Sequence, residues 1–159
     1  MKSTLNNLSK IAIFIAAACI VIMTAIITYQ VVARYFFNAS PAWSERLSLL
    51  LLGYLVFFGA AAGVYERFHI RIDAIRNAVP PRLAKAFDVT AHVAVACAGI
   101  IMVIAGWQLT TTLWAFDIPS LGLPRGLALL PIPISGALIT LFSGAELFDV
   151  LNKKSTEAE

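Results

Sequence analysis

The chain has little charge, and long parts of it have none. Asp, Glu, Lys and Arg make up 13% of the 159 residues, whereas hydrophobic residues make up 60%. Four stretches lack all four charged residue types, at residues 11–33, 47–65, 89–116 and 126–145. An α-helix rises about 1.5 Å per residue, so about 20 apolar residues cross the hydrocarbon core of a bilayer, which is about 30 Å thick. Stretches of this length argue strongly against a water-soluble protein.

The fold class follows from these stretches. We expect an all-α integral membrane protein with four transmembrane helices and a short interfacial amphipathic helix in the middle loop. The tails and turns are too short for a soluble domain, so residues 1–159 form a single four-span membrane domain. The expected spans are about 11–33, 43–65, 86–114 and 128–150. We expect the first span to be retained, because the h-region of a signal peptide has only about 7–15 residues.

Residues that carry chemistry are scarce. Cys19 and Cys97 lie inside expected spans without a CxxC motif, so we expect each to be a small apolar packing residue. A bis-histidine haem site is not expected, because His92 falls within a span and His69 outside the spans. The sequence contains no P-loop, nucleophile elbow or metal-ligand cluster. We therefore predict a protein that is not an enzyme, with no catalytic, cofactor-binding or metal-binding residue.

Charged residues are also missing from the middle of every span. A transporter that couples ions within its own helices places such residues there, because charge in hydrocarbon is costly and is kept for a purpose. The sequence shows no inverted repeat and no helix broken at mid-membrane. The chain alone is therefore a poor transporter. Its net charge of +3 favours contact with anionic membrane lipids, and we expect no nucleic-acid partner.

The basic residues indicate how the chain is oriented. Four spans place both termini on one side, and nine of the twelve Lys and Arg residues fall on that side. By the positive-inside rule, both termini and the middle loop are predicted to be cytoplasmic. Trp43, Trp107 and Trp114 fall near the opposite ends of the spans, where amphipathic rings favour the membrane interface. We therefore predict that these three tryptophans contact the lipid interface.

The middle loop contains an amphipathic pattern. From Phe68 to Val79, apolar residues recur at spacings of 4, 3 and 4, which places them on one face of a helix. Arg71 and Arg76 point in other directions, so we expect both to contact lipid headgroups. The pattern predicts a short helix on the cytoplasmic leaflet, although residues 70–74 also alternate as a strand would.

Prolines mark the expected starts of two helices. Ser40 is a candidate N-cap, and Pro41 suits the first position of the second helix because its missing N–H needs no partner there. The fourth helix is expected to begin near Pro131 or Pro133, after a loop over residues 117–124.

The second span contains a packing motif. Gly59 and Gly63 have GxxxG spacing, and small residues four apart let another helix approach closely. We expect a tight contact there, with a helix of this bundle or of a partner. Thr24, Thr28 and residues 110–112 leave two alternatives open, a hydrogen bond to another helix or one to their own backbone.

The outer side carries a small charged cluster. Arg34 ends the first span, and Glu45 and Arg46 open the second after a short turn. A carboxylate near a helix N-terminus is favoured by the helix dipole. Arg34 and Glu45 are expected to pair across the turn and to anchor the ends of the two helices at the membrane interface. Together with Arg125, these residues are also candidates for contact with a partner protein.

The chain resembles the small membrane (Q-type) subunit of tripartite ATP-independent periplasmic (TRAP) transporters, over nearly its whole length. The motifs that carry the resemblance are, in order, 34–38 (RYFFN), 43–45 (WSE), 59–61 (GAA), 69–73 (HIRID), 121–124 (LGLP) and 131–133 (PIP). One position differs, because the family usually has a second acidic residue after the one that matches Glu45, and this chain has Arg46.

The resemblance implies a non-catalytic permease subunit of a sodium-coupled importer of organic acids in a bacterial inner membrane. In that family a periplasmic substrate-binding protein delivers the substrate, and a large membrane subunit moves it together with sodium. The small subunit acts as a scaffold and contributes to docking of the binding protein. Two alternatives from other classes are a membrane anchor for a respiratory or redox enzyme complex and a self-assembling channel. A channel would place polar residues along one face of a span, whereas the polar residues here gather toward the outer ends.

Overall fold

In the computed structural model, the described part of the chain forms five helices and one small hairpin. The helices are α1 (Lys2–Phe37), α2 (Ala42–Arg76), α3 (Pro81–Thr112), α4 (Arg125–Leu129) and α5 (Pro131–Asn152), and the hairpin pairs β1 (Asp117–Ile118) with β2 (Leu123–Pro124). The structure describes the backbone of residues 2–38, 41–76 and 81–152, and the side chains of residues 4–38, 41–66, 87 and 89–148.

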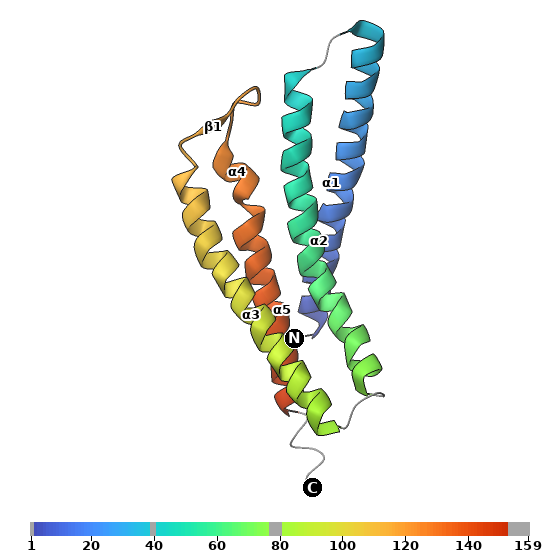
Figure 1. Ribbon diagram of the computed structural model, residues 1–159, viewed down its shortest axis with the longest axis vertical. Coiled ribbons are helices and arrows are strands. Elements are labelled where there is room, and N and C mark those ends of the chain that lie inside the picture. The colour runs from blue at the N-terminus through green and yellow to red at the C-terminus, as the bar shows by residue number, and fades with distance from the viewer. Residues whose placement is uncertain (1, 39–40, 77–80, 153–159) are drawn as a thin grey trace.

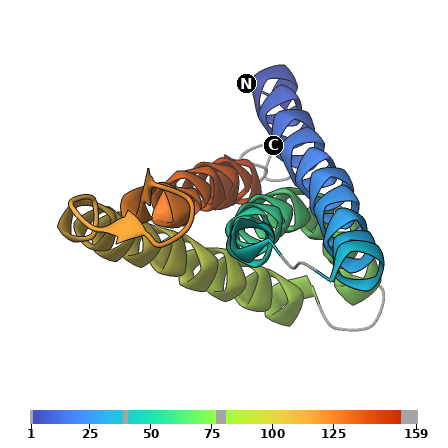
Figure 2. The same ribbon diagram turned by 90° about the horizontal axis from the view of Figure 1, so that it is seen from above.

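The four long helices lie side by side in an elongated bundle (Figure 1). Seen from above, their order across the bundle is α1, α2, α5 and α3 (Figure 2). The most extensive contacts join α3 to α5 and α1 to α2, and contacts between α2 and α5 hold the two pairs together. In the fourth span, 44% of the most apolar stretch is buried within the chain, compared with 17% in each of the other three. The other three spans therefore present most of their surface outward.

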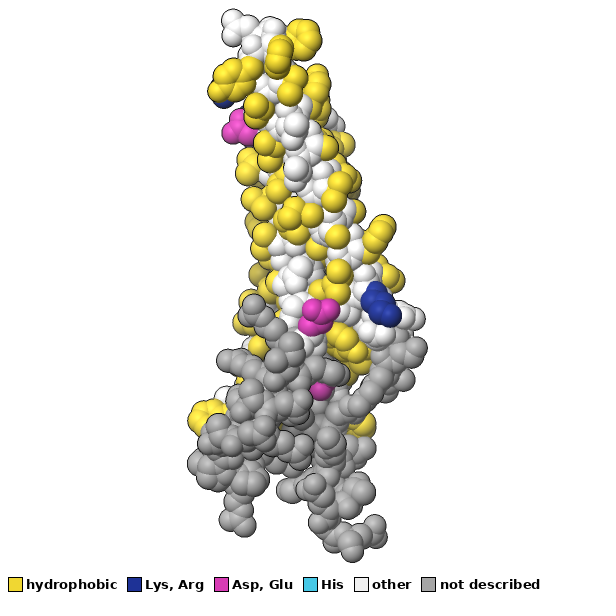
Figure 3. All heavy atoms as spheres, turned by 90° about the vertical axis from the view of Figure 1, so that its right-hand side faces the viewer, with side chains coloured by type: hydrophobic (Ala, Val, Ile, Leu, Met, Phe, Trp, Pro, Cys, Tyr) yellow, Lys and Arg dark blue, Asp and Glu magenta, His cyan; other side chains and the backbone are white. Residues whose placement is uncertain are grey.

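Four segments are long and apolar enough to cross a membrane, judged by their length and composition. They are Thr4–Phe37, Ala42–Glu66, Val89–Thr112 and Arg125–Phe148. Hydrophobic side chains cover much of the upper, described part of the face shown in Figure 3, as expected for a surface in contact with lipid or another membrane helix. The prediction of an all-helical fold with four spans is confirmed.

The interfacial helix predicted for the middle loop is not seen as a separate element. Residues 68–76 continue α2 as far as Arg76, and residues 77–80 lie outside the described part. The side chains of Arg71 and Arg76 are also outside it, so their contact with lipid headgroups stays a prediction. Helical periodicity does not reveal where one helix ends and the next begins, which is why the pattern did not distinguish these arrangements.

Small residues let α1 and α2 pack closely. Ala12, Ala16 and Cys19 are buried, and their spacings of 4 and 3 place them on one face of α1. Ala12 and Ala16 form a hydrophobic cluster with Phe58 and Ala62 of α2. The rest of α1 is largely exposed, so α1 is held by this single narrow face.

Pro41 stands just before α2 rather than inside it. The helix begins at Ala42, and the Pro41 carbonyl accepts hydrogen bonds from the Ser44 N–H at 3.2 Å and the Ser44 hydroxyl at 2.7 Å. Ser40, the predicted N-cap, lies outside the described residues.

Residues 117–124 form a hairpin where a loop was expected. β1 and β2 pair in antiparallel fashion, and Gly122 has a φ of 62°, a left-handed conformation that glycine adopts without steric cost. The Arg125 N–H donates to the Phe116 carbonyl at 2.7 Å and closes the hairpin. The hairpin lies at the same end of the bundle as the turn between α1 and α2 (Figure 1).

A side chain of α2 compensates for the break between α4 and α5. α5 begins at Pro131, one of the two prolines at which its start was predicted. Because Pro131 has no N–H, the Leu127 carbonyl lacks its usual helical hydrogen bond. The Tyr54 hydroxyl donates to this carbonyl at 2.9 Å. Backbone groups in hydrocarbon need partners within the protein, so Tyr54 permits a proline inside the fourth span.

We expect Tyr54→Phe to lower the free energy of unfolding of the purified chain by about 0.5–1.5 kcal/mol, because the Leu127 carbonyl loses its donor. Tyr29→Phe is the matched control, since the Tyr29 ring stacks on Trp43 and its side chain is exposed. Denaturant unfolding in detergent micelles measures both. Equal stabilities for the two variants would show that the Leu127 carbonyl does not depend on Tyr54.

Candidate interaction surfaces

Among the described residues, the glycines of the predicted packing motif make no close contact with another helix. A Cβ atom added at Gly59 or at Gly63 would meet nothing within 4 Å. Between them, Ala61 and Ala62 are buried, and Ala62 belongs to the cluster that joins α1 and α2. The glycines therefore point away from the bundle. Of the two alternatives left open by the sequence, a contact within the bundle is not observed among the described residues, and a contact with a partner helix stays a prediction.

A stripe of exposed and partly exposed residues runs along α2 on this outward side. We call it the α2 stripe, and it consists of Glu45, Leu49, Leu52, Val56, Gly59 and Gly63. Successive members are 3 or 4 residues apart, so they share one helix face. The stripe begins with a carboxylate at the outer end and finishes with two glycines, which make that part of the face flat.

The close approach of helices is found instead between α3 and α5. A Cβ atom at Gly99 would lie 2.9 Å from the Gly136 carbonyl and would also meet the Thr140 hydroxyl. A Cβ atom at Gly136 would lie 2.8 Å from the Gly99 carbonyl, and one at Gly106 would lie 2.8 Å from the Ile132 side chain. We call this contact the α3–α5 seam. Side chains larger than hydrogen at these positions would force the two helices apart.

A seven-residue repeat in the sequence corresponds to this seam. His92, Gly99 and Gly106 follow one another at intervals of seven residues, and all three are buried. A seven-residue repeat keeps residues on one helix face over two turns. The four-residue GxxxG spacing does not include this repeat, so the seam was not predicted from the sequence.

The outer charged residues make no ion pair with one another. Arg34, Glu45, Arg46 and Arg125 are all exposed. Among the residues that the structure describes, Arg34 and Glu45 take part in no ion pair, so the expected pairing across the turn is not observed. Their charges are therefore available to groups outside this chain.

The three tryptophans lie at the same end of the bundle as these charges. Trp43 stacks on Tyr29, with ring centroids 6.1 Å apart. Trp43, Trp107 and Trp114 are all exposed, a setting in which an indole suits the membrane interface. Their contact with lipid stays a prediction.

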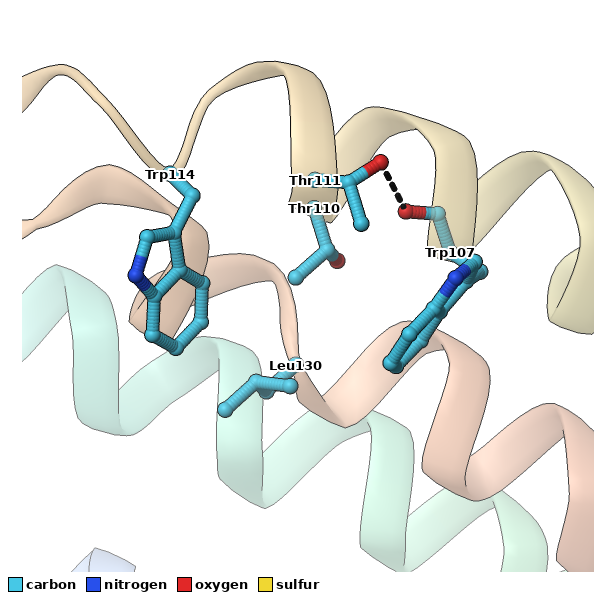
Figure 4. Close-up of a pocket in the computed structure, with 5 residues that line it drawn as sticks. All are labelled: Trp107, Thr110, Thr111, Trp114 and Leu130. Carbon is cyan, nitrogen blue, oxygen red and sulfur yellow. Dashed lines mark hydrogen bonds between the residues drawn. The ribbon is translucent and has the colours of Figure 1, made fainter.

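A groove of about 480 Å³ lies at the outer end of α3. It is lined by Trp107, Thr110, Thr111, Trp114 and Leu130. Both indoles extend from α3 toward Leu130, and Thr110 lies between them (Figure 4). Gly126 keeps α4 close to this region, because a Cβ atom there would lie 2.9 Å from the Thr110 carbonyl and would overlap the Trp114 ring.

Most hydroxyl groups in the spans bond to their own helix. Thr24, Thr28 and Thr112 each donate to the carbonyl four residues earlier, at 2.8 Å. Thr111 donates to the carbonyls three and four residues earlier. Of the two alternatives left open by the sequence, these residues follow the second. Thr110 differs, because its side chain is buried and its Oγ1 has no hydrogen-bond partner.

The two cysteines differ in their surroundings. Cys19 is buried in the contact between α1 and α2, as predicted, whereas Cys97 is exposed on α3, so its predicted packing role was wrong. In the part of the chain whose side chains are described, no three His, Cys, Asp or Glu residues lie close enough to hold a metal ion.

Comparison with known families connects these surfaces to a function. The profile of the DctQ component of tripartite ATP-independent periplasmic transporters matches residues 23–153. The chain belongs to this family. It is therefore the small permease subunit of a TRAP transporter, a multi-pass membrane protein and a transport component without enzymatic activity. This assignment takes the place of the alternatives of a redox-complex anchor and a self-assembling channel.

Curated relatives agree with the assignment. A TRAP transporter small permease protein of Haemophilus influenzae is 27% identical over 139 residues, which cover 86% of this chain and 84% of the relative. The sialic acid TRAP transporter small permease protein SiaQ of Vibrio cholerae is 20% identical over 95% of this chain and 86% of its own length. The C4-dicarboxylate small permease protein DctQ of the same species is 35% identical over 54% of this chain and 37% of its own length.

The family also defines the kind of assembly in which this small permease subunit works. A tripartite periplasmic transporter has a large permease and a periplasmic binding protein as its other parts. The sialic acid TRAP transporter permease protein SiaT of Haemophilus influenzae is 26% identical over 81 residues, which make up only 13% of that longer protein.

Because the α3–α5 seam has no space for side chains, we expect Gly136→Leu to reduce the yield of folded small permease subunit sharply. Overpacking costs about 1–3 kcal/mol in general, and here the obstacle is backbone. Gly144→Leu on the same helix is the control, since a Cβ atom there meets nothing within 4 Å. Size-exclusion chromatography in detergent gives the yields. Wild-type yield for Gly136→Leu would contradict the seam.

Proposed function

We propose that this small permease subunit is the fixed, non-transporting scaffold of a sodium-coupled TRAP importer of organic acids. The observation that carries the proposal is the α2 stripe, a largely apolar helix face that ends in two glycines. No described residue of the bundle lies within 4 Å of a Cβ atom added at either glycine. The sequence supports the non-transporting role of this subunit, because no Asp, Glu, Lys or Arg occurs at the centre of any span. Sodium coupling follows from the family resemblance.

The substrate class is inferred from the relatives. Two of them are named for C4-dicarboxylates and for sialic acid, and both compounds carry carboxylates. An organic acid is therefore the proposed substrate class of the assembled transporter. Among the residues whose side chains the structure describes, no Asp, Glu, Lys or Arg is buried, so the substrate is expected to bind elsewhere in the complex.

The α2 stripe is the proposed contact with the large permease. Lipid provides no hydrophobic drive for helix association, so membrane helices associate where small residues allow close van der Waals packing. Gly59 and Gly63 provide that flat surface, and no atom of the described residues lies within 4 Å of a Cβ atom added at either position. At the outer end, Glu45 continues the same face, and its carboxylate suits a basic group of the partner.

We expect Gly59→Leu and Gly63→Leu to leave the folding of this chain intact but to reduce recovery of the large permease about fivefold or more, because the added side chains hold the partner helix away. The measurement is co-purification of an untagged large permease with tagged small subunit, normalised to the amount of small subunit.

Gly144→Leu is the matched control for this experiment as well, since it adds the same side chain at an open position of α5. Wild-type recovery of the large permease with both stripe variants would mean that the α2 stripe faces lipid and that another surface holds the partner.

The outer end of the bundle is the proposed docking side for the periplasmic binding protein. Arg34, Arg46 and Arg125 are exposed there, on the side of the membrane opposite to the one predicted for the nine other basic residues. Docking at this end requires it to face the periplasm, with both termini in the cytoplasm. The basic residues of the other end support that orientation in a bacterial inner membrane.

A reporter enzyme that is active only in the periplasm tests the orientation directly. Fused after Glu159, it should be inactive, whereas inserted into the outer hairpin after Ser120 it should be active. The insertion point is a hairpin turn at the surface, where insertions are best tolerated. Activity at Glu159 would place the outer charged cluster in the cytoplasm and would exclude docking of the binding protein there.

A further inference from the structure

The groove between Trp107 and Trp114 has an apolar body and one unsatisfied polar group. It is an open groove of about 480 Å³ on the outside of the bundle, so it is suited to a molecule that is itself surrounded by lipid. The two indoles and Leu130 supply most of its lining, and both indoles are exposed on the outside of the bundle. In a membrane, this surface faces acyl chains and headgroups.

The unsatisfied group is the Thr110 hydroxyl. Thr110 is only 2% exposed, and its Oγ1 has no hydrogen-bond partner. Its neighbours Thr111 and Thr112 both bond to backbone carbonyls of α3. Leaving a buried hydroxyl unpaired costs about 1–3 kcal/mol, so a molecule that offers an acceptor in the groove would be bound more tightly than one that does not.

The depth of Thr110 indicates which acceptor is available. Thr110 lies two residues before the end of α3 at Thr112, between two tryptophans of the kind that mark the membrane interface. At this boundary, between the hydrocarbon core and the headgroups, a phospholipid carries its two ester carbonyls. Such carbonyls accept hydrogen bonds and cannot donate them, which matches a free hydroxyl donor.

A basic residue stands beside the outer end of the groove. Arg125 is exposed and directly precedes Gly126, whose backbone packs against the Thr110 carbonyl and the Trp114 ring. A guanidinium near the membrane surface attracts anionic headgroups by about 1 kcal/mol. Asp117 is also exposed and lies across the hairpin from Pro124, so the groove favours a negatively charged lipid over a zwitterionic one if Arg125, rather than Asp117, meets the headgroup.

We infer that the groove binds one molecule of an anionic phospholipid. One acyl chain lies between Trp107 and Trp114 against Leu130, an ester carbonyl accepts the Thr110 hydrogen bond, and the headgroup lies near Arg125. The site is separate from the α2 stripe and would hold whether or not that stripe binds the large permease. It places an ordered lipid on the α3 side of the subunit.

Native mass spectrometry of the full chain tests the site, with palmitoyl-oleoyl phosphatidylglycerol as the anionic probe and palmitoyl-oleoyl phosphatidylcholine as the zwitterionic one. We expect one phosphatidylglycerol to be retained in preference to phosphatidylcholine. Thr110→Val should weaken retention about fivefold, the equivalent of about 1 kcal/mol. Thr110→Ser keeps the hydroxyl and should retain lipid as the wild type does.

Two further variants separate the contributions to lipid binding. Arg125→Gln should remove the preference for phosphatidylglycerol while leaving phosphatidylcholine binding unchanged. Thr112→Val is the matched control, because the Thr112 hydroxyl already bonds to the Gln108 carbonyl and lies outside the groove lining. Helical content from circular dichroism identifies any variant that has not folded.

Equal retention by folded Thr110→Val, Thr112→Val and wild type would overturn the site. If Thr110→Val does not fold, Arg125→Gln decides, and an unchanged preference for phosphatidylglycerol would also overturn it. The same titration on the complex with the large permease should give the same single lipid. Loss of that lipid from the wild-type complex would show that a helix of the partner, rather than phospholipid, occupies the groove.

Discussion

Close backbone contact between α3 and α5 is the interaction on which the rest of the bundle depends. Membrane lipid is as apolar as the side chains that helices bury, so helices associate through van der Waals packing and hydrogen bonds. Gly99 and Gly136 remove the side chains that would separate the two backbones. α5 packs against α3 on one side and against α2 on the other. In the contact with α2, the fully buried Phe142 of α5 lies against Tyr65 of α2, with ring centroids 5.0 Å apart. α1 is then added to α2 through its narrow face of small residues.

The order of these contacts separates the surfaces that hold the subunit together from those left for partners. The α3–α5 seam packs two helices of the chain together. The hydrogen bond from Tyr54 to the Leu127 carbonyl provides that backbone group with a partner in hydrocarbon. Among the described residues, the α2 stripe and the outer charged residues contribute neither to this packing nor to this hydrogen bonding. The proposed scaffold role rests on this division, because the two glycines of the α2 stripe face outward and no charged residue lies at the centre of a span.

The parts of this structure that could be predicted from the sequence depend on composition along the chain, and the parts that could not depend on how each helix is rotated. Uncharged stretches revealed the four spans, and Pro131 marked the start of α5, because both signals act locally. Which glycines meet a neighbouring helix depends on rotation, so the GxxxG motif at Gly59 did not reveal that Gly99 and Gly136 make the close contact within the bundle. Tyr54 and Leu127 are 73 residues apart, and no local pattern connects them. The exposure of Cys97 likewise follows from the face that α3 turns outward.

Uptake by reconstituted liposomes tests the central claim, that this subunit is a scaffold and does not transport. Liposomes that contain the small permease subunit alone, its folding verified by circular dichroism, are given a sodium gradient and a radiolabelled C4-dicarboxylate or sialic acid with the matching binding protein. We expect no uptake above that of empty liposomes, and sodium-dependent uptake once the large permease is added. Sodium-dependent uptake by the small subunit alone would contradict the claim, because ion coupling would then take place in spans that contain no charged residue at their centre.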